Sequence, residues 1–139
     1  MTSSPPSGSG SLPERLDVGD DRLVPTRDPS AALRRLVDAV LVESQEGERE
    51  RVLALLDEHG AALADRSTAP GHLTGSALVV DAAHERVLLM LHTKLQRWLQ
   101  PGGHADGDED ILAVALREAE EETGLKNFNL IHPGIFDID

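Results

Sequence analysis

The 139-residue sequence contains no cysteine, which excludes disulfide bonds and thiolate chemistry. It also lacks a long apolar run, because the longest ones, such as residues 87–91, are far too short to span a bilayer. The N-terminal residues show no basic patch followed by an apolar core, the pattern of a signal peptide. We therefore expect a cytoplasmic protein without a membrane partner.

Basic residues are scarce as well, since 13 lysines and arginines stand against 25 acidic residues, for a net charge of −12. A protein that binds a nucleic-acid polymer needs a basic face to neutralise phosphates, and no cluster of lysine or arginine occurs in the sequence. Binding to nucleic-acid polymers is therefore not expected. A small anionic substrate fits this charge only if metal ions offset it.

The first half of the chain divides into a tail and two helices. Residues 1–28 are rich in Ser, Pro and Gly, which predicts a disordered tail. Asp28 and Pro29 form a helix start, and apolar residues at helical spacing extend the helix over residues 29–44. Gly47 is expected to break it before a second helix, which Gly60 weakens. This helical pair, residues 29–66, is expected to pack on the domain or across a dimer, so a homo-oligomer stays open.

After residue 70 the pattern changes to short runs typical of strands. Residues 76–80 and 87–92 predict a hairpin around a polar turn. Residues 99–103, with one proline and two glycines, predict a loop, and residues 108–123 predict a helix that Gly124 ends. Residues 128–131 predict a further strand. The apolar face expected for the helix consists of Ile111, Leu112, Ala115, Leu116 and Ala119.

The predicted helix carries four acids at its C-terminal end, namely Glu118, Glu120, Glu121 and Glu122. Like charges three or four residues apart repel, and a helix C-terminus prefers cations. Three of the acids, all except Glu120, fall within an arc of roughly 100°. Carboxylates gathered in this way suit a hard divalent cation, although a solvated acidic face is the alternative.

The segment around these acids resembles a known motif. Gly103 is followed after five residues by Glu109, and after seven more by Arg117-Glu118-Ala-x-Glu-Glu-x-Gly-Leu. This spacing resembles the Nudix box of the Nudix hydrolases at every fixed position, with Ala119 smaller than the usual aliphatic residue. Residues 98–103 resemble the family's lead-in, and a looser resemblance reaches back to about residue 72. We therefore expect a Nudix domain over residues 72–139.

The resemblance implies an α+β fold, an α/β/α sandwich with a mixed sheet, and a hydrolase that cleaves a diphosphate linkage. The expected substrate is a nucleoside-diphosphate-type small molecule, attacked at phosphorus by water with Mg²⁺, or Mn²⁺ in its place. By resemblance, Arg117 and Glu109 form an ion pair that fixes the loop against the helix. One of the glutamates, or an acid further downstream, acts as base. The metal site implied by the family comprises Glu118, Glu121, Glu122, Gly102 and Gly103, the glycines offering a tight turn and a bare carbonyl.

Flanking residues are weaker candidates. His104, Lys94 and Arg97 lie beside the motif and are candidates for substrate contact, whereas Trp98 is expected to pack. The family fold normally continues with further strands and a closing helix, but few residues follow Leu125, so the domain is expected to be incomplete. The alternative function is a non-catalytic Nudix-like module that senses a nucleotide or binds a partner through the helical pair.

Overall fold

The computed structural model describes Asp21, Val24, Thr26, Asp28 and residues 30–37, 45–132 and 134–139. Its elements are α1 (Ala31–Val37), α2 (Glu46–His59), the 3-10 helix η3 (Gly60–Ala64), β1 (Thr74–Ser76), β2 (Met90–His92), β3 (Arg97–Leu99), β4 (Gly102–His104) and α3 (Ile111–Thr123). The predicted α+β class is confirmed. None of the helices in these ranges has both the length and the apolar composition that crossing a membrane requires.

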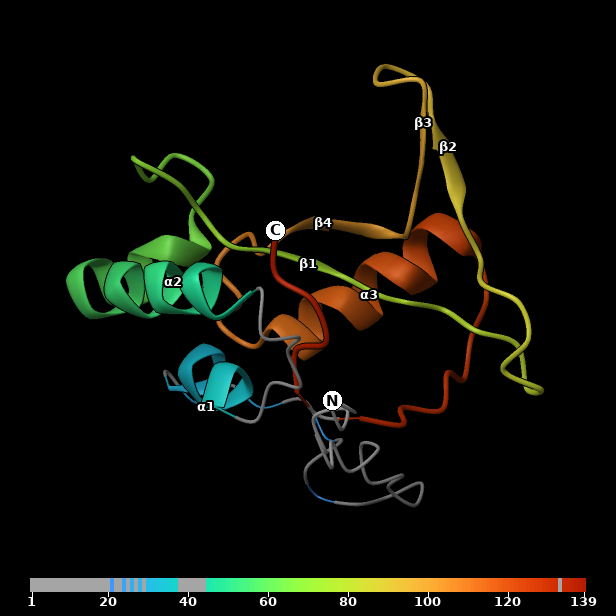
Figure 1. Ribbon diagram of the computed structural model, residues 1–139, viewed down its shortest axis with the longest axis horizontal. Helices are drawn as coiled ribbons and strands as arrows, with labels where there is room; N and C mark the ends of the chain where they lie inside the picture. Colours follow the sequence, from blue (N-terminus) through green and yellow to red (C-terminus); the bar gives the residue numbers. More distant parts are fainter. Residues whose placement is uncertain are drawn as a thin grey trace, which may run out of the picture.

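Helix α3 lies along a two-stranded sheet made by β1 and β4 (Figure 1). The two strands are antiparallel, and Gly75 is the register partner of Gly103. Strands β2 and β3 form a second antiparallel pair, a hairpin that projects away from the body of the molecule (Figure 1). Both strand pairs in the described ranges are thus antiparallel. Helix α1 contacts both α2 and α3.

The core between α3 and the first sheet consists of small side chains. Ala64, Ala105 and Val114 are buried together, and Leu73 packs against them. A β-carbon on Gly75 would lie 2.9 Å from Cγ1 of Val114 and 3.0 Å from the carbonyl oxygen of Ile111. The backbone of β1 therefore rests directly on α3, at a distance that only glycine permits.

A buried ion pair joins α1 to the start of α3. Asp110 and Arg35 are 0% and 3% exposed. The guanidinium donates from Nε to Oδ1 and from Nη2 to Oδ2, each at 3.1 Å. Asp110 is also the N-cap of α3, since its Oδ1 accepts from the Leu112 N–H at 3.0 Å, and its Oδ2 accepts from the Thr26 N–H at 2.8 Å. One carboxylate thus connects three segments of the chain.

The predicted N-terminal helices are correct in kind but differ in their bounds. The first helix begins at Ala31 instead of at residue 29, and Oδ1 of Asp28 accepts from the Ser30 N–H at 2.9 Å in the turn before it. The rest of that predicted helix, residues 38–44, lies outside the described residues. Gly47 lies within the first turn of α2 instead of breaking a helix, and Gly60 ends α2 as its C-cap with φ of +52°. A glycine near a helix terminus costs less than one at its centre, because few intrahelical bonds depend on it.

The predicted tail, residues 1–28, lies mostly outside the described residues. Its last part is not free of the fold, however, because the Thr26 N–H is bonded to the buried Asp110. At the other end of the chain, the Asp137 carboxylate accepts a hydrogen bond from the side-chain amide of Gln45.

The strand predictions need larger corrections. The polar turn of the first predicted hairpin is present, but its arms share only the isolated bridge between Val80 and Val87. Residues 102–103 belong to β4 instead of a loop, because strand pairing with β1 extends through them. Residues 128–131 form no strand, since no described strand pairs with them. Of the predicted apolar face of α3, Ala119 is buried and the other four residues are half-buried, whereas Val114, outside that face, is buried as well.

The ion pair predicts a specific response to acid. Burial raises the pKa of Asp110, but hydrogen bonds from Arg35 and Thr26 outweigh it, so that its pKa lies below the ordinary value for Asp. A lowered folded-state pKa stabilises the protein above the unfolded-state pKa, and this contribution is lost as the pH falls through the folded value. Asp110→Asn should therefore cost about 3 kcal/mol of unfolding free energy at pH 7, with the difference from wild type shrinking as the pH drops below about 4.

Urea titrations at several pH values measure this difference. Asp57→Asn, on the exposed side of α2, is the matched control and should change the free energy of unfolding at pH 7 by less than about 0.5 kcal/mol. A difference between Asp110→Asn and wild type that stays constant from pH 7 to acid would contradict the ionised pair.

Candidate active site

The acidic residues lie at the C-terminal end of α3, the end that repels them. The last turn of α3 contains no basic residue, and its first turn no acid. Gly124 ends the helix as predicted, in the left-handed conformation with φ of 72°, and donates its N–H to the Glu120 carbonyl oxygen. Lys126 contacts Glu120 from beyond the helix at 3.1 Å. A bound cation would offset the remaining negative charge at this end of the helix.

Two of the glutamates lie directly against strand β4. Oε2 of Glu122 accepts a hydrogen bond from the Gly102 N–H at 2.9 Å. Oε2 of Glu118 lies so close to Gly103 that a β-carbon on this residue would collide with it. Glu121, between them in the helix, is exposed and has no bonding partner among the described residues. The fold thus brings two of the three predicted metal ligands to the two predicted glycines, with the third beside them in the sequence.

The two glycines do not form the tight turn that was predicted for them. Gly102 and Gly103 lie in an extended strand and not in a tight turn. Their lack of a side chain allows close approach, of Ser76 to Gly102 and of the Glu118 carboxylate to Gly103. Glycine is therefore needed at these two positions because it has no β-carbon, and not because it can adopt a positive φ.

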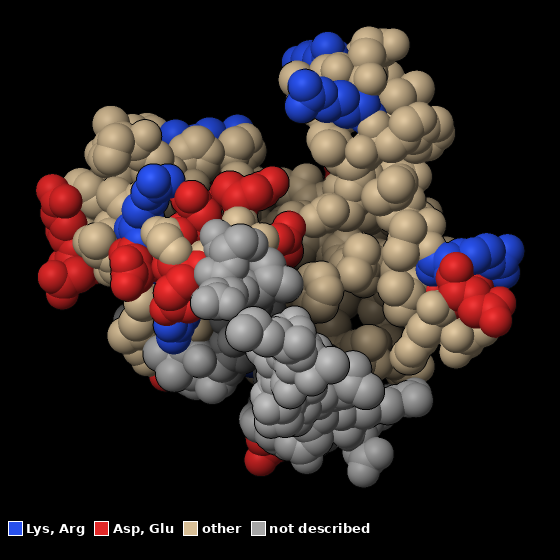
Figure 2. Space-filling model, viewed as in Figure 1, with Lys and Arg blue, Asp and Glu red and all other residues tan. Residues whose placement is uncertain are grey.

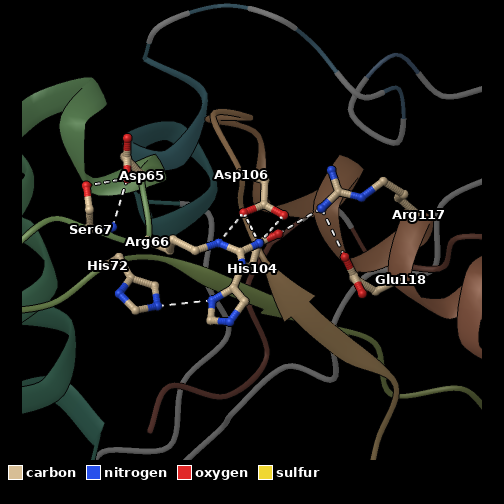
Figure 3. Close-up of polar contacts among 8 residues, drawn as sticks. All are labelled: Asp65, Arg66, Ser67, His72, His104, Asp106, Arg117 and Glu118. Carbon is tan, nitrogen blue, oxygen red and sulfur yellow. Dashed lines mark hydrogen bonds and ion pairs between the residues drawn. The ribbon is translucent and has the colours of Figure 1, made fainter.

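Arg117 fixes this arrangement, although not through the predicted partner. Its Nη2 donates to the His104 carbonyl oxygen at 2.7 Å and to Oε1 of Glu118 at 3.0 Å (Figure 3). Glu109 forms no ion pair with Arg117 and no hydrogen bond with any described side chain. The expected ion pair is therefore absent, because Glu109 precedes the N-cap of α3 whereas Glu118 is adjacent to Arg117 on the helix itself.

The residues fit a divalent metal in their chemistry. In residues 45–132, and in the other described parts of the chain, no three acidic or histidine side chains are gathered closely enough to hold a metal ion. Glu118 and Glu122 are instead occupied by N–H donors, from Arg117 and Gly102. These are positively polarised partners, which a cation can replace on the same oxygens. Carboxylate oxygens beside an open backbone are also the donor set that Mg²⁺ prefers.

Comparison with known families matches residues 70–135 to the NUDIX domain. The predicted resemblance to the Nudix family is thus confirmed over these residues. The matched segment contains β1 to β4, α3 and all the predicted site residues, and it begins close to the predicted boundary at residue 72.

Curated relatives resemble the same part of the chain. An m7GpppN-mRNA hydrolase NUDT17 from Danio rerio is 34% identical, over 51% of this chain and 25% of its own length. A CMP-5'-(N-acetyl-N-hydroxy-3-aminopropyl)phosphonate hydrolase from Streptomyces rubellomurinus is 40% identical, over 46% of this chain and 32% of its own. An asymmetrical bis(5'-nucleosyl)-tetraphosphatase from Rattus norvegicus is 43% identical, over 34% and 32%. The chain thus spans about a third or less of these relatives, and no solved structure matches it.

Next to Arg117 and Glu118 lies a polar network that was not predicted from the sequence. Nε2 of His72 and Nδ1 of His104 lie 3.0 Å apart, and Arg66 forms a two-pronged ion pair with Asp106 (Figure 3). Hydrogen bonds from Arg66 lower the pKa of the Asp106 carboxyl. His104, a predicted substrate residue, is thus held between His72, through its ring, and Arg117, through its carbonyl oxygen.

The other predicted substrate residues lie elsewhere in the Nudix domain. Lys94 is in the turn of the β2–β3 hairpin and Arg97 is in β3, and neither contacts a described acidic residue. Figure 2 shows basic side chains at the end of this hairpin, whereas acidic ones gather over α2. Trp98, expected to pack, is 65% exposed on the same hairpin. The structure therefore does not join Lys94 and Arg97 to the glutamates.

Sequence reasoning missed Arg35, Asp110, His72, Arg66 and Asp106. For Asp110 a signal existed, because an aspartate directly before an apolar helical run is a typical N-cap. Partners separated by 75 residues, as Arg35 is from Asp110, carry no such local signal.

The close contacts of β4 predict that alanine substitutions at its two glycines lower the free energy of unfolding by different amounts. In Gly102→Ala the new methyl group meets the Ser76 backbone, with Cα at 2.9 Å. It should therefore cost about 1–3 kcal/mol of unfolding free energy, as overpacking does. In Gly103→Ala the obstacle is only the end of the flexible Glu118 side chain, so the cost should stay below about 1 kcal/mol.

Thermal and urea unfolding of both variants measures these costs. Gly71→Ala, where an added β-carbon has no atom within 4 Å, is the matched control. The contact assignment fails if Gly103→Ala is as destabilising as Gly102→Ala.

Proposed function

We propose that this Nudix domain hydrolyses a diphosphate linkage in a nucleoside-diphosphate-type small molecule, with Mg²⁺ as its metal and Mn²⁺ as a substitute. The observation that carries the proposal is the position of Glu118 and Glu122 against the Gly102–Gly103 backbone. Acids at the unfavourable end of a helix, aligned on a bare strand, suit a metal-assisted reaction of an anionic substrate.

In this proposal Glu118, Glu121 and Glu122 hold the metal, together with a carbonyl of Gly102 or Gly103. Bound there, Mg²⁺ offsets the diphosphate charge, polarises the phosphoryl oxygen and lowers the pKa of the attacking water. The chain's own residues position these groups. Arg117 orients Glu118 and fixes the end of β4 through the His104 carbonyl oxygen.

A proton from the attacking water must pass to a base. Among the three glutamates, Glu118 and Glu122 already accept hydrogen bonds from protein donors, whereas Glu121 has no partner among the described residues. Glu121 is therefore our candidate for the general base, because one of its two oxygens can accept a proton from water while the other contacts the metal.

The relatives support the class of substrate. Their names denote hydrolases of m7GpppN-mRNA, of a CMP-linked phosphonate and of a bis-nucleosyl tetraphosphate. All three compounds contain a nucleotide, which agrees with a nucleoside-diphosphate-type substrate. The net charge of −12 disfavours the polymeric member of this group for the present chain.

The first test of the proposal is metal binding. Millimolar Mn²⁺ or Mg²⁺ should raise the melting temperature of the full chain, because a ligand that binds the folded state stabilises it by mass action. A Glu121→Gln/Glu122→Gln double variant should lose most of this shift, while Glu50→Gln, on α2, should keep it. An equal shift in the double variant and in wild type would exclude the proposed ligands.

The second test is turnover. A Mg²⁺-dependent assay against dinucleotides, nucleotide sugars and nucleoside triphosphates should show hydrolysis of at least one class. The double variant should lose activity by about 100-fold or more, as expected when a metal-assisted step is disabled. Metal binding without turnover of any of these compounds would instead favour the non-catalytic, nucleotide-sensing module.

A further inference from the structure

Helix α1 lies outside the matched residues 70–135, yet its Arg35 is buried against the first turn of the helix that carries the acids. Both prongs of the guanidinium bind the Asp110 carboxylate. The same carboxylate caps α3 and accepts the Thr26 N–H. The start of α3 is thereby fixed in position and direction relative to α1.

The interface of α3 with the sheet offers little else to fix its register. Large side chains that interlock normally prevent one element from sliding along another. Here β1 and β4 present Gly75 and Gly103, and the buried residues around them on or beside α3 are Ala105, Val114 and Ala119. Because Val114 is the largest fully buried side chain of α3, the polar contacts at the two ends of the helix contribute to fixing its axial position.

The polar contacts at the C-terminal end belong to the proposed active site. Glu122 accepts the Gly102 N–H, and Arg117 joins Glu118 to the His104 carbonyl oxygen. In the proposed function, a metal ion replaces the N–H donors that now contact Glu118 and Glu122. The contact at Asp110 takes no part in that exchange, so it keeps the helix in register while the other end changes partners.

We propose that Arg35 is a positioning residue for Glu118 and Glu122, acting through Asp110. Eight residues, about 12 Å along the axis at the usual helical rise, separate Asp110 from Glu118, so a shift or tilt at the N-cap is carried to the acids. A buried ion pair adds little net stability over an apolar pair, but its two-pronged geometry is directional. Packing against glycines does not by itself fix the orientation of α3, whereas the ion pair does.

The decisive variant is Arg35→Lys, which keeps the charge but loses the planar fork. Arg35→Met, which removes the charge, and Asp110→Asn, which keeps an N-cap acceptor, complete the set. Arg51→Ala is the control, because Arg51 is exposed on α2 and pairs with the adjacent-turn Glu48. All measurements use the full chain, at a temperature where melting curves show each variant to be folded.

The kinetic part of the test rests on the proposed function. Arg35→Lys should melt close to wild type yet lose about 10- to 100-fold in kcat, because small misplacements of catalytic groups are costly. Its KM should change by less than about threefold, since uniform substrate binding is retained. Arg51→Ala should match wild type in both constants. If Arg35→Lys, fully folded, has wild-type kcat, or if kcat in all variants only follows the folded fraction, the positioning role is overturned.

A readout without metal or substrate separates this inference from the proposed function. The Gly102 amide is held by Glu122, so its hydrogen-exchange protection reports the register of α3 on β4. In metal-free Arg35→Lys this amide should exchange about tenfold faster than in wild type, while amides of the β2–β3 hairpin keep their rates. Unchanged protection of Gly102 would overturn the inference whether or not the chain shows turnover. A wild type without turnover but with this loss of protection in the variant would overturn only the proposed function.

Discussion

The structure depends on one buried carboxylate. Asp110 joins α1, the segment at Thr26 and the first turn of α3 through four hydrogen bonds. Taking a carboxylate and a guanidinium out of water is expensive, and only complete hydrogen bonding makes the pair tolerable. Because each bond has a direction, the pair also specifies how the N-terminal helix and the Nudix helix meet. The apolar core of small side chains does not specify this by itself.

The second constraint is the absence of side chains along β1 and β4. Glycines at Gly75, Gly102 and Gly103 let the strands approach each other and α3 so closely that added β-carbons would collide with neighbouring atoms. This closeness places the Glu118 and Glu122 carboxylates on the strand backbone. The site that we propose for an anionic substrate would thus combine acids at a helix end, a strand backbone without side chains and one arginine, Arg117. The remaining deficit of positive charge is what a divalent metal would supply.

Much of the site was predictable because its residues are close in sequence. Glu118, Glu121, Glu122 and the Gly124 helix end follow one helical period, so spacing alone placed them correctly on α3. The partner of Arg117 was predicted wrongly, since Glu109 and Glu118 are both within plausible reach in the sequence and only the direction of the chain before the N-cap separates them. The strands were predicted poorly, because two glycines in a row indicate a loop by propensity, and pairing with β1 overrode that preference.

The sequence by itself determined the α+β class, the acidic end of α3 and the motif by which the Nudix domain is recognised. These features depend on periodicity and local chemistry, which are properties of contiguous residues. The tertiary structure decided the pairing of Arg35 with Asp110, the contact of His72 with His104 and the exposure of Trp98. Each of these depends on which segments distant in the sequence meet, and no local pattern encodes that. For Arg35 and Asp110 the contact also depends on burial, which removes water from both partners.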